Sequence, residues 1–333
     1  MLDERKAAIL RVVVEEYVAT AQPVGSSAVA RLPELSVSSA TVRNEMGVLE
    51  REGYLVQPHT SAGRIPTDKG YRFFVDSLIK PGPLQPGQSQ KVRDFFDRAH
   101  GEIEQMLHAT TRLLSDLTDC TAVVIAPSYE VALVRSVQLV GLGPRVVLLV
   151  VVLSNGAVEK HSLEPRTEVN DAQLGAAGAH LASHLVGRPF GGHAAVPASG
   201  DAVVDSLCDA AVRLLEGDHG GDPDHVFVGG TARMVAAFDA VETIRKVLDI
   251  LEQEYVIVTL LKDVVGGGLS VAIGSEHGVQ PLADCSVVVA PYELEGEPAG
   301  TVGILGPTRM HYEQALAAVA VVSNRLGKAL SEG

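Results

Sequence analysis

A proline- and glycine-rich segment, PGPLQPG at residues 81–87, divides the chain more sharply than any other feature. Its three prolines and two glycines interrupt both helices and strands, because proline lacks a backbone N–H and glycine favours turns. At 333 residues the chain also exceeds the length of one ordinary domain. We therefore predict an N-terminal domain over residues 1–79, a linker over 80–87 and a larger body from residue 88 onward.

The two parts differ in charge. Residues 1–78 contain nine Lys or Arg and ten Asp or Glu, so the rest of the chain carries −13 of the formal net charge of −14. An acidic surface repels nucleic acid, which excludes a protein that coats DNA or RNA along its whole length. Only the nearly neutral N-terminal part is a candidate for contact with DNA.

The N-terminal part begins with two segments of helical period. Residues 3–20 place apolar side chains on one face of a helix, opposed by charged residues. After a break at 22–25, Ser26 or Ser27 can cap a short second helix that runs to about Leu32. Pro33 then ends this helix.

A third helix is predicted within residues 38–53. Ser38 or Ser39 is its candidate N-cap, and Gly53 is its C-terminal stop. Its apolar residues recur at a spacing that faces a core, namely Val42, Met46 and Leu49. The polar residues of this helix are therefore expected on its outer surface, namely Thr41, Arg43, Asn44 and Arg51.

A hairpin follows the third helix. Residues 54–56 and 63–66 are expected to form its two strands, and a helix over 67–79 follows with Thr67 as its cap. The order helix, helix, helix, hairpin is that of a winged helix-turn-helix.

This arrangement yields two groups of candidate DNA contacts. Thr41, Arg43 and Asn44 lie early in the third helix, where arginine can bind guanine and asparagine adenine. Small polar residues at helix starts and in the hairpin loop, with one cation, can donate to phosphates or reach a minor groove; they are Ser26, Ser27, Ser39, His59, Thr60, Ser61 and Arg64. The competing interpretations are an ordinary solvated helix face, a flexible surface turn and simple helix capping.

The body alternates between strands and helices. A long helix is expected over 88–118, followed by strands at 121–126, 133–142, 145–153 and 157–163 and by a helix over 170–186. Residues 201–262 are mostly helical, with a short strand in HVFVGG. Strands resume at 269–274, 285–291 and 300–305, and a helix over 310–330 ends the body. Strands on both sides of a helix-rich segment predict an α+β domain interrupted by an insertion.

Catalytic and metal sites are not expected. Cys120, Cys208 and Cys285 are far apart, His180 and His184 have no third ligand beside them, and the three glycines at 266–268 lack the Lys-Ser/Thr of a phosphate loop. The most apolar run, VVLLVVVL, has only eight residues and is interpreted as a buried strand rather than a membrane span. We expect a cytoplasmic protein that is not an enzyme, contacts no membrane and needs no cofactor.

Several long motifs carry a family resemblance. They are PVGSSAVARL at 23–32, SSATVRNEMGVLEREGYL at 38–55, PHTSAGRIPTDKGYRFFVD at 58–76, TARMVAAFDAVETIRKVLDILE at 231–252, AIGSEH at 272–277 and GTVGILGPTRMHYEQ at 300–314. Together they closely resemble HrcA, the heat-inducible transcription repressors of bacteria. Val42 and His277 depart from the family pattern, which has isoleucine and asparagine there.

The resemblance implies a multidomain α+β protein with an N-terminal winged helix-turn-helix, a GAF-like domain and a dimerising domain inserted into it. We assign residues 88–190 and 266–333 to the GAF-like domain and 191–265 to the insertion. It also implies a homodimer that binds double-stranded DNA at an inverted repeat called CIRCE, at the nucleoid.

The implied function is negative regulation of chaperone genes, such as the GroEL/GroES and DnaK operons, with activity supported by the GroEL chaperonin. The alternative is a metabolite-responsive repressor in which the GAF-like domain senses a small molecule.

Overall fold

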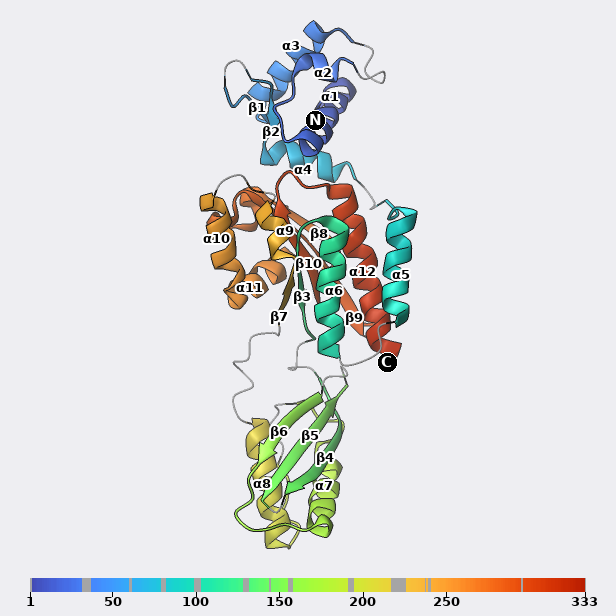
Figure 1. Ribbon diagram of the computed structural model, residues 1–333, viewed down its shortest axis with the longest axis vertical. Coiled ribbons are helices and arrows are strands. Elements are labelled where there is room, and N and C mark those ends of the chain that lie inside the picture. The colour runs from blue at the N-terminus through green and yellow to red at the C-terminus, as the bar shows by residue number, and fades with distance from the viewer. Residues whose placement is uncertain are drawn as a thin grey trace.

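The computed structural model is an elongated molecule in which three units follow one another along the long axis (Figure 1). The residues described are 2–332 without 32–36, 60–61, 79–81, 99–102, 128–131, 144, 155–157, 191–194, 217–225, 237, 239–240 and 295. Helices and strands both contribute throughout, so the chain is of mixed α+β class. Among the described helices, none is both long and apolar enough to cross a membrane.

The first unit, here called the head, has the predicted order of elements. It comprises α1 (Glu4–Thr20), α2 (Ser26–Val29), α3 (Ser39–Arg51), β1 (Leu55–Val56), β2 (Ile65–Pro66) and α4 (Asp68–Asp76). The two strands pair antiparallel. Val24 adds an isolated bridge beside them: its N–H donates to the carbonyl of Arg64, and its carbonyl accepts from the N–H of Arg64, both at 2.9 Å. Apolar faces of α1 and α3 form the core of the head through Ile9, Leu10, Val13, Val42, Met46 and Leu49, all fully buried.

The second unit, here called the central unit, is built on an antiparallel sheet in the order β7-β3-β10-β9-β8. These strands are β3 (Thr121–Ile125), β7 (Val226–Gly229), β8 (Ser270–Ile273), β9 (Cys285–Leu294) and β10 (Glu297–Pro307). Alternate residues of β3 face opposite sides, so Ala122 and Val124 join one core and Val123 and Ile125 another. The sheet is therefore covered on both faces.

One face of the sheet is covered by α6 (Ile103–Thr118) and α12 (Tyr312–Glu332), and the other by α10 (Val241–Leu251) and α11 (Glu254–Val264). Short connecting helices are α9 (Thr231–Ala236), η1 (Gly274–His277) and η2 (Gln280–Leu282). The single helix predicted over 88–118 is instead two helices, α5 (Pro86–Arg98) and α6. They lie on different sides of α12 (Figure 1). Residues 99–102, between α5 and α6, lie outside the described part.

The third unit, here called the distal unit, has its own sheet and its own core. Its antiparallel sheet has the order β4-β5-β6, formed by β4 (Val134–Gly143), β5 (Val146–Leu153) and β6 (Val158–Leu163). Helices α7 (Asp171–Leu185) and α8 (Ala202–Glu216) pack on one face of it (Figure 1). Residues 155–157, between β5 and β6, fall outside the described part.

The distal unit corrects the boundaries predicted for the insertion. Residues 132–215 contribute to its core, whereas 226–264, expected to lie in the insertion, pack on the central sheet. The reason is strand pairing: among the described strands β4, β5 and β6 form one sheet, and β3 pairs instead with β7 and β10. The run at 146–153 is a strand as expected, but only its alternate residues from Val147 to Leu153 are buried.

Candidate nucleic-acid interface

Helix α3 starts at the serine cap that the sequence predicts. The side chain of Ser38 accepts a hydrogen bond from the backbone N–H of Thr41 at 3.2 Å, and its hydroxyl lies 2.9 Å from the Thr41 hydroxyl. Such a cap satisfies an N–H that has no partner inside the helix. Gly53 follows the helix with φ +79°, the left-handed conformation that glycine adopts most readily.

The two faces of α3 differ as expected. Val42, Met46 and Leu49 are fully buried, whereas Arg43 and Asn44 are exposed on the opposite side. Arg51 is also exposed, about two helical turns further along the same face. Thr41 is half-buried, and its hydroxyl is already close to Ser38. The helix thus presents a guanidinium and an amide side by side in its first two turns.

Helix α2 begins differently from the prediction. Gly25 is its N-cap residue and makes no side-chain cap bond, while Ser26 and Ser27 are the first two helical residues. Ser26 is only 8% exposed, and its Oγ lies 3.2 Å from the Oγ of Ser39 in α3. The Ser26–Ser39 pair therefore links the two helices, with Ser26 buried and Ser39 half-buried. Ser27 is exposed.

Two hydrogen bonds join described residues on either side of the hairpin loop. The amide of Gln57 donates to the carbonyl of Ala62 at 2.9 Å, and the Ala62 N–H donates to the carbonyl of His59 at 2.9 Å. His59 is exposed at this turn. Thr60 and Ser61, the other predicted contacts, lie outside the described residues.

Arg64 is held inside the head. Its Nε and Nη2 atoms each lie 3.0 Å from Oε2 of Glu50, and the Arg64 side chain is only 17% exposed. The ion pair ties the hairpin to the last turn of α3, which fixes the spacing between them. Glu50 is a residue that sequence reasoning missed, because no local signal joins positions 14 apart in different elements.

The remaining cationic side chains of the head differ in whether they already have a partner within the protein. Arg5 and Lys6 both lie 3.8 Å from Glu45, and Lys69 sits 4.3 Å from the centre of the Tyr54 ring. Within the described residues, Arg43 and Arg51 have no ion pair and are exposed. Arg11 of α1 and Arg31 are exposed in the same way, so the outer face of α3 carries two of the four exposed head arginines that have no ion pair within the described residues.

No candidate metal centre is found in the described part of the chain. No group of three or more His, Cys, Asp or Glu side chains there is arranged to hold a metal ion. His180 and His184 are neighbours, with ring centres 4.7 Å apart, but the Nε2 of His180 lies 2.7 Å from the carbonyl of Pro197.

A helix that presents arginine and asparagine beside a hairpin is the arrangement that helix-turn-helix transcription regulators use. A family model described as the HrcA protein C terminal domain matches residues 104–316. The heat-inducible transcription repressor HrcA of Symbiobacterium thermophilum is 37% identical over 341 residues, covering 98% of each chain. That of Nocardioides sp. is 39% identical over 347 residues, covering 100% of each.

The chain belongs to the HrcA family of heat-inducible transcription repressors. Membership assigns it to negative regulation of heat-shock transcription, which is not an enzymatic role. The similarity extends to structure: a chain described as a crystal structure of a hypothetical protein at 2.2 Å resolution matches with a TM-score of 0.73 and 25% identity. That match covers 100% of this chain and 99% of the other.

Proposed function

We propose that the protein is a dimeric repressor and that its head is a winged helix-turn-helix. Each head reads one half of an inverted-repeat operator, CIRCE. The operator precedes chaperone operons such as those of GroEL/GroES and DnaK. The observation that carries the proposal is the exposed face of α3, where Arg43 and Asn44 lie free beside the hairpin. A helix of this kind enters the major groove with its N-terminal residues on base edges.

We assign a role to each candidate residue. Arg43 and Asn44 read base edges, with Thr41 beside them. Ser27, His59, Thr60 and Ser61 contact the sugar–phosphate backbone. Ser26 and Ser39 support the interface by joining α2 to α3. Arg64 fixes the hairpin against α3, and direct contact between Arg64 and DNA requires a phosphate to replace Glu50.

Arg43→Ala is expected to relax operator specificity by about 1–3 kcal/mol at one base position, because a bidentate contact to a base edge is lost. Binding to a set of operators that differ by single base pairs measures this effect. Arg11→Ala is the control, since Arg11 is also exposed but lies on α1. An unchanged base preference in Arg43→Ala removes Arg43 from base reading.

The second part of the proposal is a homodimer formed through the distal unit. One face of its sheet is covered by α7 and α8, and the other face carries Leu148, Val150 and Val152 of the central strand. Val140 and Val158 flank them and are 42% and 46% exposed. The solvated face of an antiparallel sheet is normally polar, so this apolar face suits a second copy of the chain. Two heads on one dimer then bind two half-sites with a gain from effective concentration.

Val140→Asp with Val158→Asp is expected to convert the dimer to a monomer, because the interface would bury two carboxylates without partners. Sedimentation velocity measures the change. Tyr255→Asp is the control, because Tyr255 is 76% exposed on α11 of the central unit. If the double variant remains dimeric, this face is not the dimer interface.

The third part concerns heat. We propose that the central unit is a GAF-like domain interrupted by the distal unit, and that GroEL supports repression until heat supplies it with unfolded clients. The test is binding of the purified protein to an inverted-repeat operator and to scrambled DNA, with and without GroEL, over a temperature ramp. Selective binding that fades on heating and recovers with GroEL supports the circuit. Selective binding that GroEL does not change but that a metabolite extract alters favours a small-molecule sensor.

A further inference from the structure

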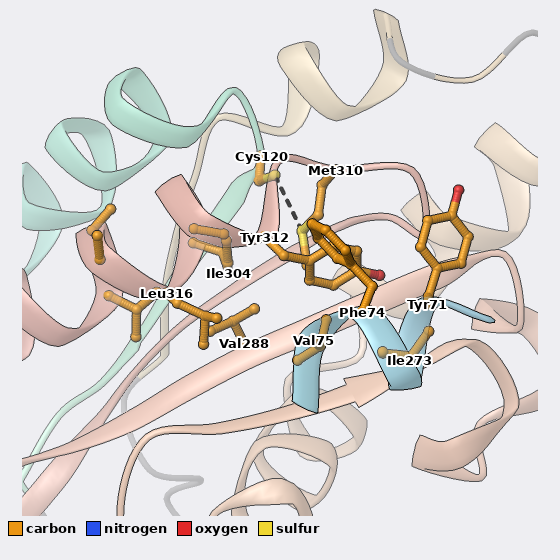
Figure 2. Packing of buried hydrophobic residues seen from close by; sticks show 14 of the residues in the cluster. Tyr71, Phe74, Val75, Cys120, Ile273, Val288, Ile304, Met310, Tyr312 and Leu316 are labelled. Carbon is orange, nitrogen blue, oxygen red and sulfur yellow. Dashed lines mark hydrogen bonds between the residues drawn. The ribbon is translucent and has the colours of Figure 1, made fainter. Parts of the chain in front are cut away.

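Helix α4 makes a second set of contacts that the DNA interface does not use. It is the last helix of the head, and its other side meets η1 and the end of β8 in the central unit. Figure 2 shows Tyr71, Phe74 and Val75 of α4 gathered near Ile273 and Tyr312 of the body. These residues belong to one buried cluster that runs from the head into the central unit.

Polar contacts across this boundary are specific. Oδ2 of Asp68 accepts hydrogen bonds from the backbone N–H of Ser275 at 3.1 Å and from the Ser275 hydroxyl at 3.0 Å. Arg72 donates from Nε to Oε1 of Glu276 at 2.9 Å and forms an ion pair through Nη2 with the other oxygen. The same Nη2 donates to the carbonyl of Val271 at 2.8 Å. Four side chains thus hold two segments that are 199 to 207 residues apart.

The η1 side of the boundary is shaped for this contact. Gly274 has φ +54°, and a Cβ there would lie 2.4 Å from Oδ2 of Asp68. Oε2 of Glu276 also accepts from the backbone N–H of Ile273 at 2.9 Å, which holds the carboxylate toward Arg72. Burial raises the pKa of Glu276, but the hydrogen bonds from Arg72 and Ile273 outweigh it and lower that pKa overall. The carboxylate is therefore kept charged.

The opposite side of α4 is clamped to the DNA-reading elements. The Thr67 hydroxyl donates to the carbonyl of Gly53 at 2.7 Å, and Nζ of Lys69 donates to the carbonyl of Glu52 at 2.8 Å. A Cβ at Gly70 would lie 2.3 Å from the carbonyl of Tyr54, so the helix backbone abuts the start of β1. Movement of α4 must therefore carry α3 and the hairpin with it.

We infer that Asp68 and Arg72 of α4, with Ser275 and Glu276 of η1, form a joint that sets the orientation of each head relative to the body. This inference rests on the proposed function, because it concerns the spacing of two heads on one operator. Through this joint, a conformational change in the central unit alters the orientation of α3 and the hairpin on DNA. These four are positioning residues, since they contact the body and not the operator.

The first test measures head orientation without DNA. Nitroxide labels at Arg11→Cys and Asn324→Cys, both exposed positions, report the head-to-body distance by pulsed electron resonance. The native thiols label slowly because burial raises the pKa of Cys120, Cys208 and Cys285 to about 12, 11 and 12. Mixing with excess unlabelled protein ensures that a labelled dimer contains one labelled chain, so that the measured distance lies within that chain. The unmodified joint is expected to give a single narrow distance distribution.

Charge reversal then tests the joint. Arg72→Glu or Glu276→Arg alone places like charges together, and each is expected to broaden the distance distribution. The two substitutions combined restore opposite charges and narrow it again. Tyr71→Phe is the matched control, since the Tyr71 hydroxyl is buried with no hydrogen-bond partner among the described residues. Narrow distributions in both single variants, with melting curves showing intact heads, overturn the inference.

Operator binding separates this inference from the proposed function. The single reversals are expected to weaken binding to the full inverted repeat by about tenfold or more, because misaligned heads lose effective concentration. Binding to an isolated half-site is expected to stay unchanged. Equal losses on both DNAs overturn the joint as an orienting device. Failure of the unmodified protein to select the operator, with the distance results as expected, overturns the proposed function and leaves the joint intact.

Discussion

Leu149→Ala is expected to destabilise the distal unit by about 2–5 kcal/mol, because the truncation leaves a cavity that its neighbours fill only in part. Leu149 is fully buried on the central strand of the distal sheet, among side chains from α7 and α8. Amide hydrogen exchange of β4–β6 across a urea series measures the change for this unit separately from the others. Operator binding should fall with it if the unit holds the dimer together.

Leu214→Ala serves as its control. It makes the same chemical change on α8 of the same unit, but Leu214 is 36% exposed, so less contact area is removed. We expect a loss below about 1 kcal/mol there. Equal losses at positions 149 and 214 would contradict the assignment of a separate distal core around β5.

Gly63→Ala is expected to destabilise the head by about 1–3 kcal/mol and to weaken operator binding, because it forces apart two backbones in contact. A Cβ at this position would lie 2.4 Å from the carbonyl oxygen of Val24. The two hydrogen bonds of 2.9 Å between Val24 and Arg64 would have to lengthen or break. Hydrogen exchange at Val24 and Arg64, together with operator binding, measures the effect.

Gly47→Ala is the matched control within the head. The nearest atom to its added Cβ is Nη2 of Arg64 at 3.9 Å, an ordinary contact with a flexible side chain. Alanine favours a helix interior over glycine by about 1 kcal/mol, so the head should become no less stable. A head that tolerates Ala at both positions would show that the hairpin does not depend on the close approach at Gly63.

The elements of the head were predictable because their signals are local. The cap at Ser38, the stop at Gly53 and the cap at Thr67 each act within a few residues, and the structure confirms all three. The exposed face of α3 follows from helical spacing alone, so Arg43 and Asn44 lie where they were expected. The cap of α2 was predicted wrongly, since Gly25 competes with two adjacent serines that carry the same local signal.

Only the tertiary structure decided which strands share a sheet. β3 and β4 follow one another in the sequence, yet β3 pairs with β10 about 180 residues later and β4 pairs with its neighbour β5. The boundaries of the distal unit depend on that choice. The same holds for the partners of charged side chains: Glu50 for Arg64 and Glu276 for Arg72. Capping and periodicity depend on neighbouring residues, whereas strand pairing and ion pairs depend on which distant surfaces the packed cores bring together.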